Sequence, residues 1–512
     1  DRNRTLLDGD GVSVSHRVDY LIVGAGIAAQ SARDAILEER PNARVLVVGE
    51  EDRRSDPGNA LPILSTLTWG MTTTMGGRAP LSQRLRQETA ALFQESPLLV
   101  AGTPAVLRDG HPDVLLDTRV ADVDVDRHLA MLSDGRVVEY KHSVLIASGA
   151  MDAGHHFAPT DRRARHIVHG LRTRGERQDV NATIGKWKAY DCRSKRTGRS
   201  KGAKRRREHV TVVGGGLVGV QTAYYLADQV MGRNTTSPRV SLVFTERAPL
   251  ARYLPRYLAN VVASRMERAG ILLNSYSVVQ YIAPLARVSR SQTTGAVVDE
   301  GAVDQAEVFF CRTFDTNLTG SFGSHLVLFA PTHLPVSSSY LDKSSHGLCE
   351  RDLVHGGIVA NSELSAASGV YVAGDAVSFP SKLGRRRVQW SVDHAAHTGY
   401  VCGKNMARHG ETPPVRYDRE PATQVDIGGT KIALIGVCSS TLETGAFWNT
   451  LSSEDRKKSA ALHGEEVGGG IFGSLANGFL VYVRGDEIVG ILLWDKGVPG
   501  TAEDRSKAAF QA

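Results

Sequence analysis

Residues 18–29 read VDYLIVGAGIAA, and residues 45–50 read VLVVGE. The first stretch begins as an apolar run typical of a buried strand, and after its glycine turn a helical pattern continues to about Glu39. The second stretch is another apolar strand, and it ends at an acid. Strand, glycine turn, helix, strand and acid in this order predict a βαβ unit of the dinucleotide-binding type.

Each small residue of this turn has a physical role in binding a pyrophosphate. Gly24 makes the tight turn, and Gly26 lets phosphates approach the backbone at the N-terminus of the helix. Ala29 is small enough for the helix to pack on the strand, and Glu50 can accept hydrogen bonds from an adenosine ribose. The alternative is a tight βα turn without a ligand, which the ordered set of features makes the weaker interpretation.

The pattern returns about 190 residues later, where residues 210–219 read VTVVGGGLVG and a second strand covers residues 240–245. The corresponding small residues and acid are Gly214, Gly216, Gly219 and Glu246. An acid at this strand end favours NAD over NADP because it repels a 2′-phosphate, although Arg247 beside it weakens that inference. Two such units indicate an FAD domain with an NAD(H) domain inserted in it.

A third motif, GVYVAGDA, covers residues 369–376. It predicts a buried strand followed by Gly374 and Asp375. In two-domain flavoprotein reductases a Gly-Asp pair at this place binds the ribityl chain and phosphate of FAD, which need an acceptor at a strand end. The alternative is an aspartate that only caps a helix.

Composition limits the class of protein. The 512 residues carry a formal net charge of +6 and 52 glycines, which is ordinary globular composition with enough material for two to four domains. The five cysteines form no CxxC or CxxxxC pair, so a disulfide framework, a dithiol redox centre and a zinc ribbon are not expected, and a reducing compartment is. No apolar run approaches the length of a membrane span.

Four further segments resemble the apoptosis-inducing factor family. They are LGRRRV (383–388), DHA (393–395), GFLVYVR (478–484) and VGILLW (489–494). The similarity runs in order from about Asp19 to Trp494. It implies an α/β fold with two Rossmann-like domains of the glutathione-reductase type and a C-terminal α+β domain. The implied limits are 17–165 and 346–413 for the FAD domain, 166–345 for the NAD(H) domain and 414–512 for the C-terminal domain.

The resemblance also implies function. It implies a mitochondrial FAD protein that reacts slowly with NADH, dimerises, and serves respiratory-chain biogenesis and, secondarily, cell death. Val120 and Arg172 are further candidates for the FAD site, Arg172 because its segment resembles the family's linker to the NAD domain.

The chain departs from this family around the expected flavin ring. Residues 60–67 lack the family's Arg and Lys, and Gln221 stands where the family has the Glu that pairs with that Lys. Gln389-Trp390 replaces Glu-His, and Gln424 replaces a Trp. Because hydride chemistry is sensitive to small misplacements of such groups, these changes predict retained FAD binding with weakened or lost NADH oxidation.

Three functions stay open at this stage. One is an active NADH-dependent flavin oxidoreductase, and another is a non-catalytic subunit or assembly factor of a large mitochondrial complex, such as the respiratory chain or the ribosome. The third is nucleic-acid association through the basic stretch Arg193–Arg207, for which a solvated loop is the alternative. His394 and His397 share a probable helix, but no carboxylate or cysteine partner is evident, so core or capping roles are expected and no metal site is predicted.

Overall fold

The computed structural model describes most of the predicted elements. It covers residues 6–7, 13–50, 113–152, 160–171, 176, 179–187, 208–227, 239–285, 288–290, 297–299, 305–330, 333–335, 349–381, 390–408, 411–427, 430–450 and 475–495. Arg172, the basic stretch 193–207, and residues 60–67 and 382–389 lie outside these ranges.

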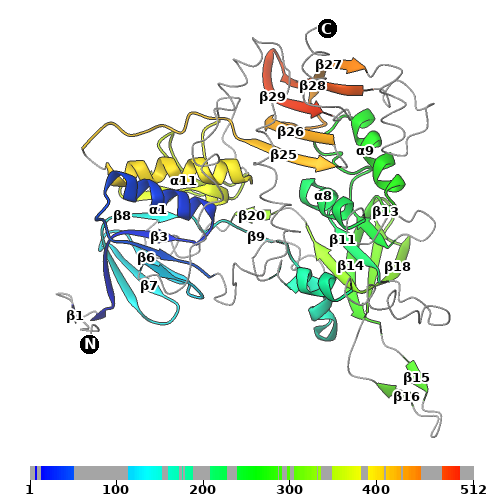
Figure 1. The fold of residues 1–512 in the computed structure, drawn as a ribbon, viewed down its shortest axis with the longest axis horizontal. Helices are drawn as coiled ribbons and strands as arrows, with labels where there is room; N and C mark the ends of the chain where they lie inside the picture. The colour runs from blue at the N-terminus through cyan, green and yellow to red at the C-terminus, as the bar shows by residue number, and fades with distance from the viewer. Residues whose placement is uncertain are drawn as a thin grey trace.

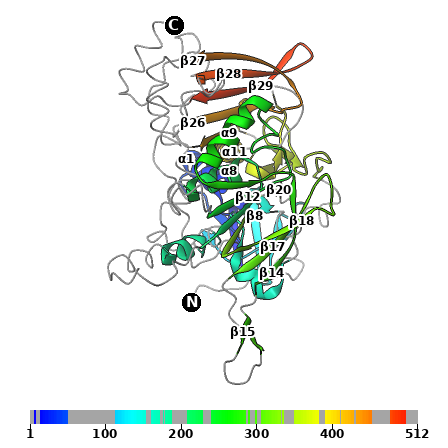
Figure 2. The same ribbon diagram turned by 90° about the vertical axis from the view of Figure 1, so that its right-hand side faces the viewer.

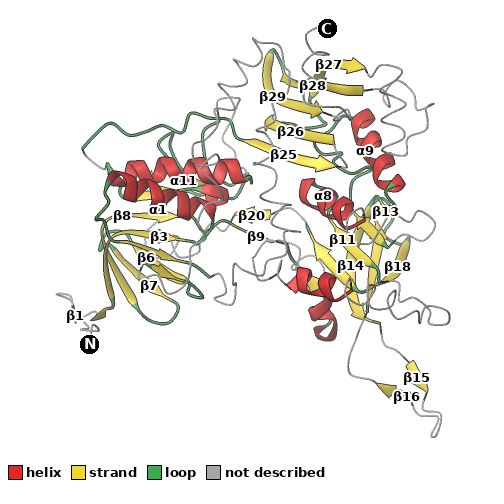
Figure 3. Cartoon of the chain, in the orientation of Figure 1, coloured by secondary structure: helices red, strands yellow, loops and turns green. Residues whose placement is uncertain are grey.

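The first unit is built on a large sheet covered on one face by two helices (Figures 1 and 3). Its strands are β3 (His16–Val23), β4 (Val45–Val48), β5 (Val114–Leu115), β6 (Val120–Asp124), β7 (Leu129–Leu132), β8 (Val137–Ile146), β22 (Ser365–Ala367) and β23 (Val370–Val372). The main order is β22-β23-β8-β3-β4-β5, and the pairs from β23 to β5 are parallel. The helices are α1 (Ile27–Glu39) and α11 (Val392–Ala407), which pack side by side.

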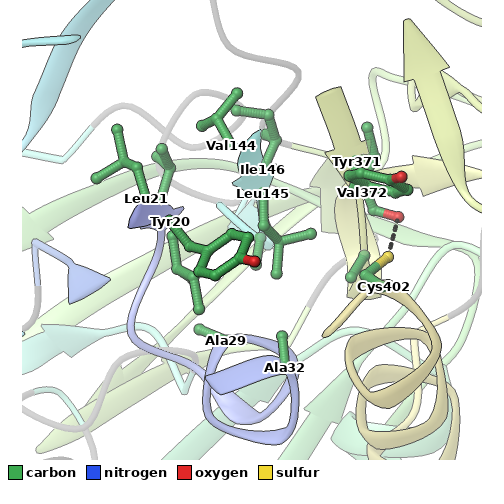
Figure 4. Close-up of a cluster of buried hydrophobic side chains, with 14 of the residues drawn as sticks. Tyr20, Leu21, Ala29, Ala32, Val144, Leu145, Ile146, Tyr371, Val372 and Cys402 are labelled. Carbon is green, nitrogen blue, oxygen red and sulfur yellow. Dashed lines mark hydrogen bonds between the residues drawn. The ribbon is translucent and has the colours of Figure 1, made fainter. Parts of the chain in front are cut away.

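The strands of this sheet are apolar, and helices or other strands cover them and bury their side chains. Tyr20 points its ring toward Ala29 and Ala32 of α1, beside strand β8 (Figure 4). Cys402 of α11 donates its S–H to the carbonyl of Val372 in β23, at 3.4 Å. Parallel strands covered in this way read as continuous hydrophobic runs, which is why the sequence predicted them well.

The second unit repeats the arrangement with a five-stranded parallel sheet. The order is β10 (Val168–His169), β19 (Leu326–Phe329), β11 (Val210–Val213), β12 (Val240–Val243) and β13 (Ile271–Asn274). Its helices are α8 (Leu217–Tyr225) and α9 (Arg256–Arg268). An antiparallel sheet of β14 (Ser277–Pro284), β17 (Ala306–Arg312) and β18 (Thr319–Ser324) lies beside it. Strand β12 is two residues shorter than the sequence predicted.

The C-terminal part forms a five-stranded antiparallel sheet. Its order is β25 (Ala422–Ile427), β26 (Thr430–Gly436), β29 (Glu487–Asp495), β28 (Leu475–Arg484) and β27 (Glu443–Thr450). Side chains such as Ile432 and Trp494 share one core cluster with Val220 of α8 and Leu258 of α9. Seen from the side, α8 and α9 lie between this sheet and the β14-β17-β18 sheet (Figure 2).

Short elements complete the described chain. The segment after β8 of the first unit pairs with the segment after β19 of the second unit. This antiparallel pair is β9 (Ala150–Asp152) with β20 (His333–Pro335). The others are β1 (Leu6–Leu7), β2 (Ser13–Val14), η2 (Arg162–Ile167), β15 (Val288–Arg290), β16 (Val297–Asp299), β21 (Ile358–Val359), η5 (Gly374–Ala376) and β24 (Val377–Ser378). None of the helices in the described ranges has the length and apolar character that crossing a bilayer requires.

Candidate functional site

The first glycine turn requires glycine at its tightest point. Gly24 has φ +113°, and a Cβ on it would lie 2.1 Å from the carbonyl oxygen of Ala147 in the loop after β8. Its N–H donates to Val48 of β4 at 2.7 Å. The turn is therefore clamped between two neighbouring strands, and a side chain at this position would be excluded both by backbone strain and by contact.

Gly26, unlike Gly24, has open space where a side chain would lie. It is the N-cap of α1 and makes no side-chain cap, and a Cβ on it would meet no atom within 4 Å. Gly26 thus leaves open space beside the positive end of the helix dipole, where a phosphate could approach the first amides of α1. The space beside Gly26 fits the pyrophosphate of a dinucleotide, whereas a turn serving only the fold would not need it.

The predicted ribose acid lies at the expected strand end. Glu50 lies two residues after the end of β4 and is exposed, and its Oε1 lies 3.4 Å from Nε of Arg119. An exposed ion pair of this kind contributes little to stability, so ribose hydroxyls could take the place of Arg119 at small cost. Val120, next in the chain, begins β6 and is buried in the core. Ala29 is buried in the same core.

The third motif meets the first in space. Gly374 has φ +67°, and a Cβ on it would lie 3.1 Å from Cβ of Ala28 in the first turn of α1. Its N–H donates to Oγ1 of Thr398 in α11 at 2.9 Å. Asp375 follows in a partly buried turn after β23. The structure therefore brings Gly26 and the Gly374-Asp375 pair to one place, as a single extended ligand would require.

The second glycine turn has the same construction. Gly214 has φ +123°, and a Cβ on Gly219 would lie 1.9 Å from the Gly214 carbonyl oxygen. Gly216 is the N-cap of α8 and has open space around it. Glu246 lies after β12 and accepts a hydrogen bond from the hydroxyl of Thr245 at 3.0 Å. Its Oε1 lies 3.7 Å from Nε of Arg252, an ion pair that the sequence did not predict.

Elements carrying the family departures also meet. Gln221 lies on α8, Gln424 on β25, and Trp390 directly before α11. Strand β25 packs against both α8 and α11, so it bridges the two units. Gln221 and Gln424 therefore lie on elements that contact each other, and Trp390 immediately precedes a third element in contact with β25.

The histidine pair needs one correction. His394 is fully buried, with its Nδ1 2.9 Å from the hydroxyl of Tyr417, which is the expected core role. His397, however, does have a carboxylate partner: its Nδ1 lies 3.3 Å from Oδ1 of Asp393. The sequence reasoning missed this partner, although its spacing of four residues on a helix was the signal for it. In the described ranges no group of three or more His, Cys, Asp or Glu side chains could hold a metal ion.

The comparison with known families identifies the class of this protein. A family model described as pyridine nucleotide-disulphide oxidoreductase matches residues 18–314, which is more than half of the chain. The chain therefore belongs to the pyridine nucleotide-disulphide oxidoreductase family, whose members bind flavin and pyridine nucleotide. The sequence has no CxxC or CxxxxC cysteine pair.

Within that family the chain is similar to apoptosis-inducing factors. It is 25% identical over 452 residues to apoptosis-inducing factor 1, mitochondrial, of Dictyostelium discoideum, covering 86% of this chain and 71% of that protein. It is 27% identical over 517 residues to the putative apoptosis-inducing factor 1, mitochondrial, of Drosophila melanogaster, covering 93% of this chain but only 61% of that one. The predicted resemblance to this group is confirmed.

Solved structures share the fold. A ferredoxin reductase from Rhodopseudomonas palustris superposes with a TM-score of 0.58 at 16% identity, covering 93% of this chain and 91% of that one. An NAD-dependent persulfide reductase from A. fulgidus gives a TM-score of 0.61 at 16% identity, covering 96% and 76%. The predicted fold class, with two Rossmann-like units, is confirmed.

Proposed function

We propose that this chain is a mitochondrial FAD protein that also binds NADH but oxidises it slowly or not at all. The observation that supports it best is the open helix N-terminus at Gly26, placed beside the Gly374-Asp375 turn. The two relatives whose names include "mitochondrial" support the compartment. The proposed domain limits are 17–165 with 346–413, 166–345, and 414–512.

Specific residues would hold the two cofactors. Those proposed for FAD are Gly24, Gly26, Ala29, Glu50, Val120, Arg172, Gly374 and Asp375, and those for NAD(H) are Gly214, Gly216, Gly219 and Glu246. The backbone amides of each turn would bind the pyrophosphate, and the two acids would accept hydrogen bonds from ribose hydroxyls. When bound, FAD supplies the capacity to accept a hydride and pass on electrons, and this chain's own residues bind and orient it.

The weak redox activity is proposed from charge. Gln221 on α8 stands where the family has a Glu, and Trp390 before α11 stands where it has a His, so both positions lack an ionisable side chain. Charged groups aimed at a reacting ring stabilise the charge that develops there, and neutral groups do this less well. A site of this kind would keep its ligand because binding rests on the phosphate ends, while hydride transfer would slow.

Anaerobic mixing with NADH tests this proposal. The purified, FAD-loaded chain should keep most of its visible flavin absorbance over minutes with excess NADH, whereas dithionite should bleach it fully and so show that the flavin is accessible to reduction. Rapid and complete bleaching by NADH would instead establish an active oxidoreductase and contradict the weakened-activity proposal.

A second candidate function is that of a non-catalytic subunit or assembly factor in a large mitochondrial complex. The neutral residues at the departures favour it, because a scaffold has no need of a tuned ring. Co-migration of the chain with a respiratory or ribosomal complex in a density gradient would support it, and migration only as a monomer or dimer would oppose it. Nucleic-acid binding through Arg193–Arg207 stays a proposal, to be tested by band shifts against salt with that stretch deleted.

A further inference from the structure

The segment that joins α11 to the C-terminal sheet is tied to the first turns of α11. We define it as residues 411–421. In this joining segment the hydroxyl of Tyr417 lies 2.9 Å from Nδ1 of His394, and Nη2 of Arg419 donates to Oδ1 of Asp393 at 2.9 Å. Immediately after it, the amide of Ala422, the first residue of β25, donates to Oδ2 of Asp393 at 3.4 Å. The start of the C-terminal sheet is thus bonded to the start of α11.

Asp393 is the centre of these contacts. Its side chain is only 14% exposed, and that of Arg419 is 20% exposed. Both carboxylate oxygens are used, one for the guanidinium and one for the strand amide. Although burial works against ionisation, the hydrogen bond from His397 and the nearby positive charge of Arg419 hold the pKa of Asp393 below its usual value. The carboxylate is therefore charged at neutral pH.

His397 also contacts Arg419 at this junction. Its Nε2 lies 2.8 Å from Nη1 of Arg419. Its Nδ1 lies 2.8 Å from the carbonyl oxygen of Asp393. Arg419 is consequently held by two side chains of α11, four residues apart.

The same two helical turns hold the cofactor motif on their other side. Thr398 accepts a hydrogen bond from the amide of Gly374 at 2.9 Å and donates one to the carbonyl of His394 at 2.6 Å. Residues 391–398 therefore connect the Gly374-Asp375 turn to the first residue of β25. A rigid connection of this kind fixes the distance between the two.

We propose that Asp393 is a positioning residue, which holds the start of β25 and the C-terminal sheet at a fixed place against the Gly374-Asp375 side of the FAD site. The inference rests on the proposed function for the presence of FAD. It adds a residue, outside both glycine turns, that would control the surroundings of the bound flavin without touching it. The pyrophosphate site proposed at Gly26 lies on α1, whereas Asp393 lies on α11.

The test compares Asp393→Asn with Glu208→Gln in the full chain. Glu208 is also a buried carboxylate paired with an arginine, at 2.6 Å from Arg239, but it lies in the second unit away from the junction. Two readouts are taken from each variant: hydrogen exchange at the amides of 411–427, and the visible circular dichroism and midpoint potential of the bound flavin. Arg419→Gln serves as a second variant that breaks the same junction from the other side.

Distinct outcomes follow. Asp393→Asn and Arg419→Gln should each speed exchange at 411–427 at least tenfold and change the flavin dichroism and potential, with FAD affinity altered less than threefold, while Glu208→Gln should change neither readout. Unchanged exchange, or faster exchange with an unaltered flavin spectrum and potential, would overturn the positioning role. If the unmodified chain binds no FAD, the proposed function fails, and unchanged exchange would separately overturn the holding of β25.

Discussion

Gly399 of α11 and Ala28 of α1 lie so close that a Cβ on Gly399 would stand 2.2 Å from the Ala28 carbonyl oxygen. One turn later Gly403 makes the same approach to Ala32, at 2.3 Å. Ala28 also faces Gly374, so this contact holds the N-terminus of α1 and the Gly374-Asp375 turn together. The close helix pair thus brings together the two segments proposed to bind FAD.

Gly399→Ala should destabilise the fold. The added methyl would collide with backbone, and overpacking of this kind costs about 1–3 kcal/mol, which outweighs the roughly 1 kcal/mol that alanine gains over glycine in a helix. Denaturant unfolding measures the change. Gly323→Ala in β18 is the matched control, since its Cβ would meet Leu285 at an ordinary 3.4 Å and its stability should stay within about 0.5 kcal/mol. Equal stability of the two variants would show that α1 and α11 are further apart.

Gly26→Ala and Gly216→Ala test which nucleotide each glycine turn binds. Each new methyl meets no protein atom within 4 Å, so folding stability should change by less than about 0.5 kcal/mol. The methyl would occupy the space proposed for a pyrophosphate, so Gly26→Ala should lower FAD affinity at least tenfold and leave NADH binding intact, and Gly216→Ala should do the reverse. Each variant is the other's control in titration calorimetry. Normal FAD binding by Gly26→Ala, or normal NADH binding by Gly216→Ala, would show that this glycine turn is not the binding site of that nucleotide.

Glu246→Ala should weaken NADH binding. The carboxylate lies after β12 and 3.7 Å from Arg252, and its loss would remove both a hydrogen-bond acceptor for the ribose and the negative charge that repels a 2′-phosphate. We expect the dissociation constant for NADH to rise about tenfold, and that for NADPH to stay level or fall. Equilibrium dialysis of both nucleotides against one preparation makes NADPH the internal control. A parallel loss of both would indicate general damage to the site instead of a lost ribose contact.

Glu39 makes stability depend on acid. Hydrogen bonds from Arg408 and from Lys404, the latter at 2.8 Å, hold its pKa at about 2, against 4.5 when unperturbed. Because the folded pKa is the lower one, this stabilisation is present above about pH 4.5 and is lost as the pH falls toward 2. Glu39→Gln should cost about 1 kcal/mol at pH 7 and less below pH 4.

The neighbouring carboxylate provides the control for that prediction. Glu38 also reaches Lys404, at 2.9 Å, but its side chain is 61% exposed, so Glu38→Gln should cost clearly less at pH 7. Urea unfolding from pH 7 down to pH 3 measures both variants. A constant gap between Glu39→Gln and the unmodified chain across this range would show that Glu39 does not contribute through its charge.

Local sequence patterns were enough to predict the two glycine turns and the strands before them. The strand Val45–Val48 lies within the predicted stretch 45–50, and Gly24 and Gly214 adopt the positive φ angles that a tight glycine turn requires. Period and turn chemistry are properties of a few consecutive residues, so a single sequence carries them.

Contacts between distant parts of the chain were not predictable in this way. The pairing of Glu50 with Arg119, of Glu246 with Arg252, and of Asp393 with Arg419 depends on where loops and strands meet after folding. The extension of the second unit's core into the C-terminal sheet has the same origin, since each strand there reads only as a short apolar run. Long-range packing of this kind leaves no signature within one segment.

The FAD content of the purified, unmodified chain tests the central claim most directly. The protein is purified without denaturant and then unfolded, and the released cofactor is identified by chromatography. It should be FAD, at a near-stoichiometric ratio to protein. Protein purified without cofactor should take up added FAD to the same ratio. A folded chain that is colourless and binds no added FAD would contradict the account.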